Sequence, residues 1–482
     1  MKIALVHVLD KGRERETYLP PLGLGSIAAT LRAQCGMEEI SIPEFTSGEE
    51  IRRLAPDLVG ISCVSQNYDL ARALAAELKA SCGVPIIVGG PHVSGLPSSL
   101  GPEFDIGVIG EGEETMAELV RLFEAGRPSP AALGRVAGIV YRDGGALVKT
   151  PPRPPVRPLD NLPHPARDLL RIGPFAHMVT SRGCPCRCTF CSSSKIWNGL
   201  RSHSAEYVFE EIRELAGRWG ARRINLMDDL FPADGKRLHR IADLVEAEGL
   251  DRAVCFACHG RAEFINEEVC RDLRRMGVQA ITFGFESGSQ RVLAWLKKGA
   301  ATVEGNMRAA ALCRNAGMRV GGSFIIGSPG ETRGEILETL DFIRKSGIIG
   351  GDVYVLTPYP GTEVWEHALR HGIVSEDMEW GRLACDDFAE HPGIVLDTAV
   401  SHAELVELYL MIRGELRRLL DANARFLYAR DYPVRNLLSL RRLLRAARRP
   451  AKAVSLLGDL LSYRMMGKGP AGGPPPAASS RR

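Results

Sequence analysis

"SRGCPCRCTFC", the stretch from Ser181 to Cys191, places four cysteines within eight residues. Cys184, Cys188 and Cys191 have the spacing C-x3-C-x2-C. A structural zinc site usually takes four protein ligands from two separated pairs, and no convincing second pair lies near this loop. Three thiolates can instead hold three irons of a cubane cluster and leave the fourth iron open to an exogenous ligand. The spacing therefore favours an iron–sulfur cluster over zinc.

The composition predicts a multidomain, cytoplasmic protein. The chain has 482 residues, 45% of them hydrophobic, which is enough for about three domains of roughly 150 residues. No run of about 18 apolar residues is present to span a bilayer, and residues 1–6 indicate a first strand rather than a secretory signal. The twelve cysteines argue for metal or catalysis rather than disulfides in a reducing compartment. The net charge of +3 is too small to indicate nucleic-acid binding.

Residues 1–125 alternate apolar runs with helical segments, which predicts a doubly wound, Rossmann-like α/β domain. Glycines follow the predicted strands, at the carboxyl ends where open α/β sheets bind ligands. We therefore expect a binding site at this edge of the sheet. The predicted strands are residues 3–8, 57–62, 84–90 and 105–110, the predicted helices are residues 25–34, 70–79 and 114–123, and the glycines are Gly60, Gly89, Gly90, Gly110 and Gly112.

Residues 126–172 are predicted to connect two domains. A hairpin is expected around Asp143 and Gly144. The stretch "PPRPPVRPLDNLPHP", residues 151–165, follows it. Prolines at this density cannot hold a helix and form a semi-rigid connector, so a domain boundary is expected here.

Residues 173–370 contain six predicted strand-plus-helix units. Sequential units of this kind need right-handed crossovers, which leaves an open doubly wound sheet or an incomplete barrel as candidates. The cysteine loop follows the first strand of this domain. The predicted strands are residues 177–181, 223–227, 253–257, 280–285, 319–326 and 352–356.

The cysteine spacing, with Phe190 before the last cysteine, resembles the signature of the radical S-adenosylmethionine (SAM) superfamily. The resemblance implies a partial TIM-type (β/α)6 barrel and a [4Fe-4S] cluster on Cys184, Cys188 and Cys191, with SAM chelating the open iron. It also extends to "MDDLF", "HGRAEFI", "FGFESGS", "FIIGSPGET" and "YVLTPYPGT" at the ends of the later strands. The residues that it assigns to SAM are Phe190, Met227, Asp228, Asp229, Arg261, Glu286 and Ser287.

Several of these residues also have a purely structural interpretation. Arg261 fits the SAM carboxylate or an ordinary surface ion pair, and Glu286 fits the ribose hydroxyls, the amino group or a helix N-terminus. Cys186 departs from the commoner form of the motif and is interpreted as a neutral variant. Cys255 and Cys258 are three residues apart in a predicted strand, where they would face opposite sides, so two buried strand cysteines are favoured over a second metal site.

Phrases in the first domain resemble the cobalamin-dependent branch of the same superfamily. They are "PLGLGSIAATLR", "VGGPHVSGLP", "IGEGEET" and, in the linker, "PLDNLPHPARDLL". The usual corrinoid motif D-x-H-x-x-G is absent, because Gly90 occupies the aspartate position before His92. The resemblance therefore implies cobalamin held base-off without a histidine on cobalt. The predicted cobalamin contacts are Ser62, Gly89, Gly90, Pro91, His92, Gly110, Glu111 and Gly112.

The carboxyl-terminal part is predicted to be helical over residues 371–466 and to end in a disordered tail, residues 467–482. The stretch "NLLSLRRLLRAARRP" predicts a basic amphipathic helix. Packing on the barrel with a solvated basic face is favoured for it, and peripheral contact with an anionic membrane is the second interpretation. Nucleic acid is a poorer third, because aromatic residues are not interleaved with the arginines.

The resemblance implies that a reduced cluster cleaves SAM to a 5′-deoxyadenosyl radical, which removes hydrogen from an unactivated carbon. Carbon methylation by way of methylcobalamin is the leading outcome, and ring formation or oxidative rearrangement is the alternative. A small, hydrophobic or lipid-like substrate and a flavodoxin or ferredoxin as electron donor are expected. A non-catalytic carrier is disfavoured because the SAM-facing segments are present, and a methylthiotransferase because the first domain lacks a further three-cysteine set.

Overall fold

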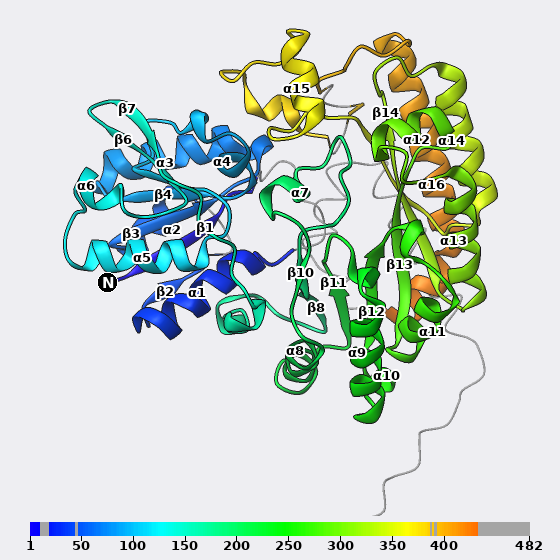
Figure 1. Cartoon of the computed structure of the whole chain (residues 1–482), viewed down its shortest axis with the longest axis horizontal. Helices are drawn as coiled ribbons and strands as arrows, with labels where there is room; N and C mark the ends of the chain where they lie inside the picture. The colour runs from blue at the N-terminus through cyan, green and yellow to red at the C-terminus, as the bar shows by residue number, and fades with distance from the viewer. Residues whose placement is uncertain (10–18, 44–46, 386–387, 390–392, 432–482) are drawn as a thin grey trace, which may run out of the picture. The chain divides into compact units, whose positions relative to one another are not determined.

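The computed structural model describes residues 1–9, 19–43, 47–385, 388–389 and 393–431. Met1–Leu419 form the first compact unit. The seven-stranded and the six-stranded sheet both lie in the first unit (Figure 1). The predicted basic helix and the predicted tail lie outside the described residues. Among the described residues, no helix is both long and apolar enough to cross a membrane.

The first domain is built on a seven-stranded sheet in the order β2-β1-β3-β4-β5-β6-β7. Its first five strands pair in parallel, which confirms the predicted doubly wound α/β domain. The strands are β1 (Ile3–His7), β2 (Ile40–Ser41), β3 (Leu58–Ser62), β4 (Ile86–Gly89), β5 (Ile106–Val108), β6 (Ile139–Asp143) and β7 (Ala146–Lys149). The helices are α1 (Leu22–Cys35), α2 (Gly48–Leu54), α3 (Tyr68–Cys82), α4 (Pro91–Gly95), α5 (Glu113–Glu124) and α6 (Pro130–Leu133).

The predicted hairpin is present, but it belongs to the first sheet rather than to a linker. Strand β6 pairs antiparallel with β5, so that Gly107 lies opposite Val140. The turn places Gly144 at φ 55° and Gly145 at φ 90°. Two successive positive φ angles are those of a type I′ turn, whose twist matches that of the strands it joins. The sheet of the first domain therefore extends to Lys149, beyond the predicted boundary.

The second domain is a six-stranded parallel sheet in the order β15-β14-β13-β12-β11-β8. Because each strand pairs with its neighbours in sequence, this is the incomplete barrel of six units that the sequence predicts. All six predicted strands are present. They are β8 (Phe175–Met178), β11 (Arg223–Leu226), β12 (Cys255–Gly260), β13 (Val278–Glu286), β14 (Arg319–Ile326) and β15 (Gly351–Val355). A short hairpin, β9 (Ser181–Arg182) and β10 (Arg201–Ser202), frames the cysteine loop.

Most helices of the second domain begin at polar caps. Side chains of Ser204, Asp234, Asn266, Thr302 and Thr332 each accept a hydrogen bond from a backbone N–H of the first turn. Such caps satisfy N–H groups that have no partner within the helix. The helices are α7 (Ser193–Ile196), α8 (Ala205–Gly217), α9 (Gly235–Ala247), α10 (Leu250–Ala253), α11 (Glu267–Arg275), α12 (Gln290–Lys297), α13 (Val303–Asn315), α14 (Arg333–Ser346) and α15 (Glu363–Arg370).

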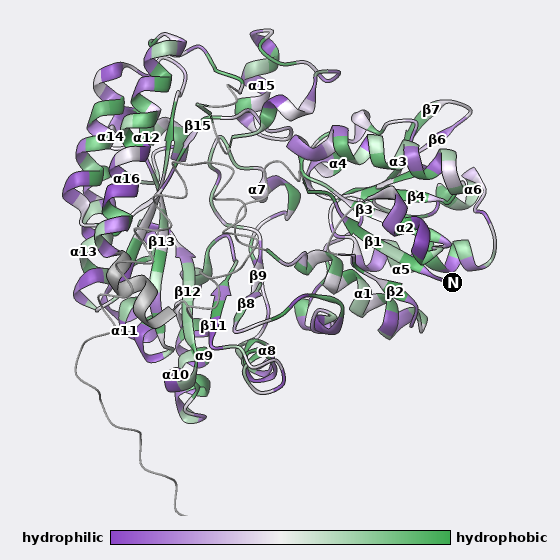
Figure 2. Cartoon of the chain, turned by 180° about the vertical axis from the view of Figure 1, so that it is seen from behind, coloured by the Kyte–Doolittle hydropathy of each residue, from purple (hydrophilic) through white to green (hydrophobic). Residues whose placement is uncertain are grey.

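The main core of the second domain lies between the sheet and these helices. Phe283, Phe285, Phe324 and Phe342 pack there with ring centroids 5.1 to 6.1 Å apart. In Figure 2 strand β13 is mostly green, whereas helices α13 and α14 carry both colours. This is the pattern expected when each helix turns one apolar face toward a sheet.

Residues 372–401 differ from the predicted helical region. Their described part forms only the 3-10 turn Trp380–Leu383, and α16 (His402–Asp431) then begins. The Trp380 ring lies 4.5 Å from the His92 ring and 5.8 Å from the Trp365 ring. Its backbone N–H donates to Asp69 at 2.7 Å. This segment is therefore held by its contacts with the first domain and not by the hydrogen bonds of a helix.

Replacing Trp380 is expected to destabilise the joint between the two domains. Trp380 is buried, with 3% of its surface exposed. Trp380→Ala should lower the free energy of unfolding by about 3–5 kcal/mol, because truncation of a buried aromatic side chain leaves a cavity. Urea unfolding followed by circular dichroism measures this loss. Trp295→Ala, at a half-exposed position of α12, is the control, and an equal loss in the two variants would contradict the role of Trp380.

Candidate active site

The cysteine loop starts at a glycine that has no room for a side chain. Gly183 has φ +81°, and a Cβ there would lie 2.2 Å from the carbonyl oxygen of Gly199 and 2.8 Å from the Cβ of Trp197. The backbone needs this conformation to leave strand β9 and enter the loop. Gly199, on the facing segment, has φ +93° with nothing within 4 Å of a Cβ. Gly183 therefore sets where Cys184 begins.

The four thiols of the loop are partly buried. Burial raises the pKa of Cys188, and it raises the pKa of Cys191 to about 11. A hydrogen bond from Cys184 lowers the pKa of Cys186.

Arg261 lies beside this loop. Its Nη1 is 2.9 Å from Sγ of Cys188, and its Nη2 is 2.5 Å from a carboxylate oxygen of Glu263. The Arg261 Nε is buried and has no hydrogen-bond partner. A buried N–H without a partner is costly unless a ligand satisfies it. The unpartnered Nε is therefore a fit for the carboxylate of a bound amino acid such as the methionyl part of SAM.

Glu286 is a buried carboxyl in a strained backbone. Strand β13 shifts register against β14 between Gly284 and Glu286, and Glu286 has φ 62°. Burial raises its pKa, although Lys297 lies 3.6 Å away and opposes this. Positive φ at a residue other than glycine is costly, and such strain is concentrated at functional sites. The neighbouring Ser287 bonds Thr339 of α14 at 3.2 Å.

The two aspartates of "MDDLF" have different surroundings. Asp228 is buried and accepts hydrogen bonds from Thr180 and from Ser181, whose Oγ lies 2.9 Å away. It therefore fixes the start of the cysteine loop to the end of β11. Asp229 accepts a hydrogen bond from Ser193 and lines a cavity together with Met227. Phe190 is half-buried and packs against the apolar core next to the first domain.

This cavity, with a volume of about 370 Å³, is lined by both domains. From the first domain come the loops after β3, β4 and β5, and from the second come Arg182, Gly183, Met227 and Asp229. Gly110 has φ +81° and open space where a Cβ would lie. The cavity therefore provides a glycine-lined cradle at the strand ends, as the sequence predicts. The predicted cobalamin residues that line it are Ser62, Gly89, Gly90, Pro91, Gly110, Glu111 and Gly112.

Buried ion pairs join the rim of this cavity to the cysteine loop. Arg182 lies 2.6 Å from Glu111 and 2.5 Å from Glu113. Arg201 also pairs with Glu111, at 2.9 Å, and Ser26 donates to Glu113 at 2.7 Å. Sequence reasoning missed Arg182, Glu113 and Arg201. The signal present was Glu111 and Glu113 in "GEGEE", but no local pattern identifies the arginines that these two glutamates meet.

The comparisons with known proteins agree with these two domains. Residues 178–343 match the radical SAM superfamily, and residues 11–120 match the B12 binding domain. An uncharacterized methyltransferase of Pyrococcus horikoshii is 34% identical over 390 residues, which cover 76% of this chain and 82% of that protein. The chain belongs to the B12-binding group of the radical SAM superfamily. It is therefore a radical SAM enzyme.

Two further proteins resemble the enzyme more distantly. The anaerobic magnesium-protoporphyrin IX monomethyl ester cyclase of Rubrivivax gelatinosus is 26% identical, over 76% of this chain and 70% of that protein. The structure of the methyltransferase TsrM from Kitasatospora setae, with cobalamin and a [4Fe-4S] cluster bound, has a TM-score of 0.66 at 18% identity. It covers 88% of this chain and 90% of the TsrM chain, so the two proteins share a fold.

The family identifies the cofactors of the two domains. A radical SAM domain uses a [4Fe-4S] cluster and SAM, and a B12 binding domain uses cobalamin. In this enzyme the cysteine loop with Arg261 fits the cluster and SAM, and the glycine-lined cavity fits cobalamin. Which individual residues contact SAM and cobalamin stays a prediction.

His92 lies apart from the cavity. Its Nδ1 is 3.1 Å from Ser65 Oγ and its Nε2 is 3.0 Å from Ser99 Oγ. Its ring centroid lies 3.9 Å from that of Tyr68. Both ring nitrogens are engaged within the first domain, so neither faces the strand ends. These contacts indicate a structural role for His92.

Replacing Gly183 is expected to reduce cluster incorporation. In Gly183→Ala the new Cβ meets the carbonyl oxygen of Gly199, so the loop must shift and the three thiolates lose their arrangement. Iron bound per chain after anaerobic reconstitution should fall several-fold. Gly199→Ala, which carries a similar φ penalty without the close contact, is the matched control. Equal iron content in the two variants would refute the steric argument.

His92 should make stability depend on pH. Burial lowers its pKa to about 3, against about 6.5 in the unfolded chain. Below pH 6.5 the unfolded state therefore binds the extra proton, and stability falls by up to about 1.4 kcal/mol per pH unit from this group. In His92→Gln the decline in melting temperature from pH 7.5 to pH 5.5 should be smaller than in the wild type. Parallel declines would contradict this.

Proposed function

We propose that the enzyme methylates an unactivated carbon of a small, hydrophobic molecule. The observation that carries this proposal is the single cavity lined by the strand ends of the B12 binding domain and by the residues next to the cysteine loop. A methyl carrier and a radical generator must reach the same carbon. Residues from both domains on one cavity meet that requirement. The methyltransferase from Pyrococcus horikoshii supports the reaction class.

When bound, the cluster would supply the electron that cleaves SAM, and cobalamin would supply a transferable methyl group. The chain supplies binding and orientation. The Arg261 guanidinium pairs with the SAM carboxylate through its free Nε, and Glu286 accepts from the amino group or the ribose hydroxyls. Burial of both side chains, each 7% exposed, excludes water and strengthens these contacts.

The character of the cavity supports a hydrophobic substrate. Its wall includes Leu24, Ile61, Val108, Trp197 and Met227. The surface of the cavity is mostly apolar, although Glu113, Arg182 and Asp229 also line it. Its apolar part suits an apolar ligand. An electron donor of the flavodoxin or ferredoxin type and a peripheral membrane contact of the basic carboxyl-terminal segment remain proposals from the sequence.

Ring formation without net methyl transfer is the second candidate. The similarity to the cyclase of Rubrivivax gelatinosus over most of both chains favours it. Both reactions begin with hydrogen removal from carbon, so the fold alone suits either. The two candidates differ in the fate of the methyl group of SAM.

The test is anaerobic reconstitution with iron, sulfide and hydroxocobalamin, followed by desalting and by reaction with reductant and methyl-deuterated SAM. We expect about four irons per chain with about one cobalt, formation of 5′-deoxyadenosine, and labelled methylcobalamin in the mass spectrum. Cys188→Ala should lose the iron and the 5′-deoxyadenosine, whereas Cys186→Ala should retain the iron.

Iron and 5′-deoxyadenosine without retained cobalt would overturn methyl transfer and favour ring formation. Retained cobalt that never acquires the labelled methyl group would do the same. Iron and cobalt without 5′-deoxyadenosine would overturn both candidates and indicate a carrier.

A further inference from the structure

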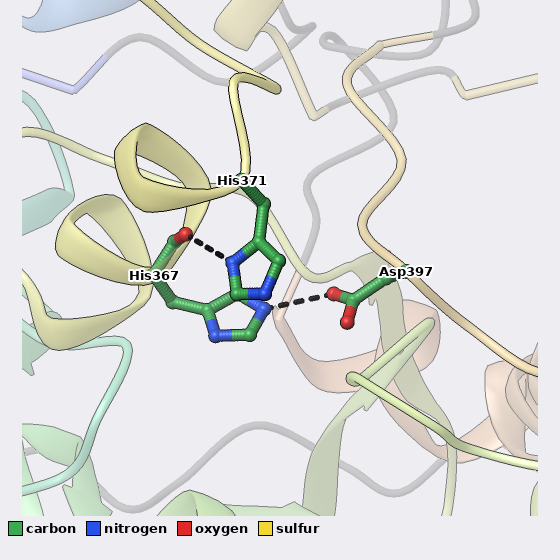
Figure 3. A group of neighbouring side chains, drawn as sticks. All are labelled: His367, His371 and Asp397. Carbon is green, nitrogen blue, oxygen red and sulfur yellow. Dashed lines mark hydrogen bonds and ion pairs between the residues drawn. The ribbon is translucent and has the colours of Figure 1, made fainter.

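Two histidines at the end of helix α15 lie next to a carboxylate from a distant segment. His367 and His371 are four residues apart, so both project from one face of the helix. Asp397 approaches from the segment before α16 (Figure 3). Each residue offers one ligand atom, and these atoms lie within 4.8 Å of one another. The three residues lie outside the candidate active site.

The His371 ring has the orientation of a metal ligand. Its Nδ1 lies 2.8 Å from the backbone carbonyl oxygen of His367. A carbonyl oxygen only accepts hydrogen bonds, so Nδ1 carries the proton and Nε2 keeps its lone pair. Histidines that bind metals usually donate the other ring N–H to a carbonyl or carboxylate in this way. The helix itself therefore fixes the tautomer that leaves Nε2 available to an ion.

The ligand atoms of His367 and Asp397 lie nearly as far apart as two ligands of one metal ion. His367 Nε2 lies 2.8 Å from Asp397 Oδ1, and the two imidazole centroids are 4.2 Å apart. Ligand atoms around a tetrahedral zinc ion lie about 3.3 Å apart. A separation of about half an ångström beyond the hydrogen bond would admit the ion. The half-exposed His367 and the exposed His371 and Asp397 leave solvent a path to the site.

From this geometry we propose that His367, His371 and Asp397 bind a divalent transition-metal ion of the zinc type. Two imidazoles and one carboxylate are ligands that suit Zn²⁺ and its neighbours. Three protein ligands leave one position for water. The site does not depend on the proposed methyl transfer, and its ligands are separate from the cysteine loop.

The ion would clamp segments that adjoin the active site. At the other end of α15, the backbone N–H groups of Glu363 and Val364 donate to the carbonyl oxygen of Thr189, within the cysteine loop, at 3.0 and 3.2 Å. The carbonyl oxygen of Asp397 accepts from Gly330 at 2.8 Å, in the loop after β14. An ion that holds Asp397 to α15 would therefore steady both the cysteine loop and the loop after β14.

The test uses the cluster-reconstituted full-length enzyme in equilibrium dialysis against buffered Zn²⁺, with zinc per chain measured by mass spectrometry. Wild type is compared with His371→Gln and Asp397→Asn. His239→Gln is the matched control, because His239 is an exposed helical histidine with carboxylate partners, Asp272 and Asp243, but without a second imidazole. Zinc-edge X-ray absorption reports the ligand atoms, which separates this site from zinc on cysteines.

We expect about one zinc per wild-type chain with nitrogen and oxygen ligands at about 2.0–2.2 Å. His371→Gln and Asp397→Asn should bind zinc at least about tenfold more weakly, and His239→Gln should match the wild type. Zn²⁺ should raise the melting temperature of the wild type and of His239→Gln only.

Equal zinc affinity in wild type, His371→Gln and Asp397→Asn would overturn the proposal. A zinc edge dominated by sulfur at about 2.3 Å would also overturn it, because it would place the ion on cysteines. The proposed reaction is tested separately, because 5′-deoxyadenosine and labelled methylcobalamin are measured in enzyme dialysed against chelator before reconstitution.

Discussion

The buried ion pairs of Arg182 with Glu111 and Glu113 are the interaction on which the active-site arrangement depends. They connect the loop after β5, in the B12 binding domain, to the residue that precedes Gly183 and the cysteines. Buried pairs contribute little net stability, but breaking one leaves an uncompensated charge, so they allow few alternative arrangements. Asp228 holds the same loop from the side of β11, and backbone bonds to Thr189 hold it from α15.

The cavity is a consequence of this arrangement. Glycines end the strands of the first sheet, so a flat ligand can approach the backbone closely. The same edge faces Met227 and Asp229 at the ends of the second sheet. The strain at Glu286 and the unpartnered Arg261 Nε lie on the cysteine side of the barrel. Backbone strain and unpartnered polar groups are unfavourable, and in folded proteins they are concentrated at sites that bind a ligand or catalyse a reaction.

Much of the fold follows from short-range patterns. The six strands of the second domain, the hairpin at Gly144 and the cysteine spacing all rest on periodicity or on residues a few positions apart. The expectations that differed from the structure concern long-range contacts. Strands β6 and β7 joined the first sheet because β5 offered an open edge, and residues 372–401 stayed irregular because Trp380 packs on His92. Neither the pairing of β6 with β5 nor the packing of Trp380 on His92 can be predicted from the local sequence.

The sequence by itself determined the fold class and the family, and it predicts the three cluster cysteines, since each depends on residue types at fixed local spacing. Only the tertiary structure decided what the polar side chains meet. In the folded chain Asp228 accepts hydrogen bonds from Thr180 and Ser181, and His92 lies between two serines. Arg182 pairs with Glu111 and Glu113. Asp397 lies next to two histidines. The physical reason is that charge pairing and burial act over short distances in space between residues that are far apart along the chain.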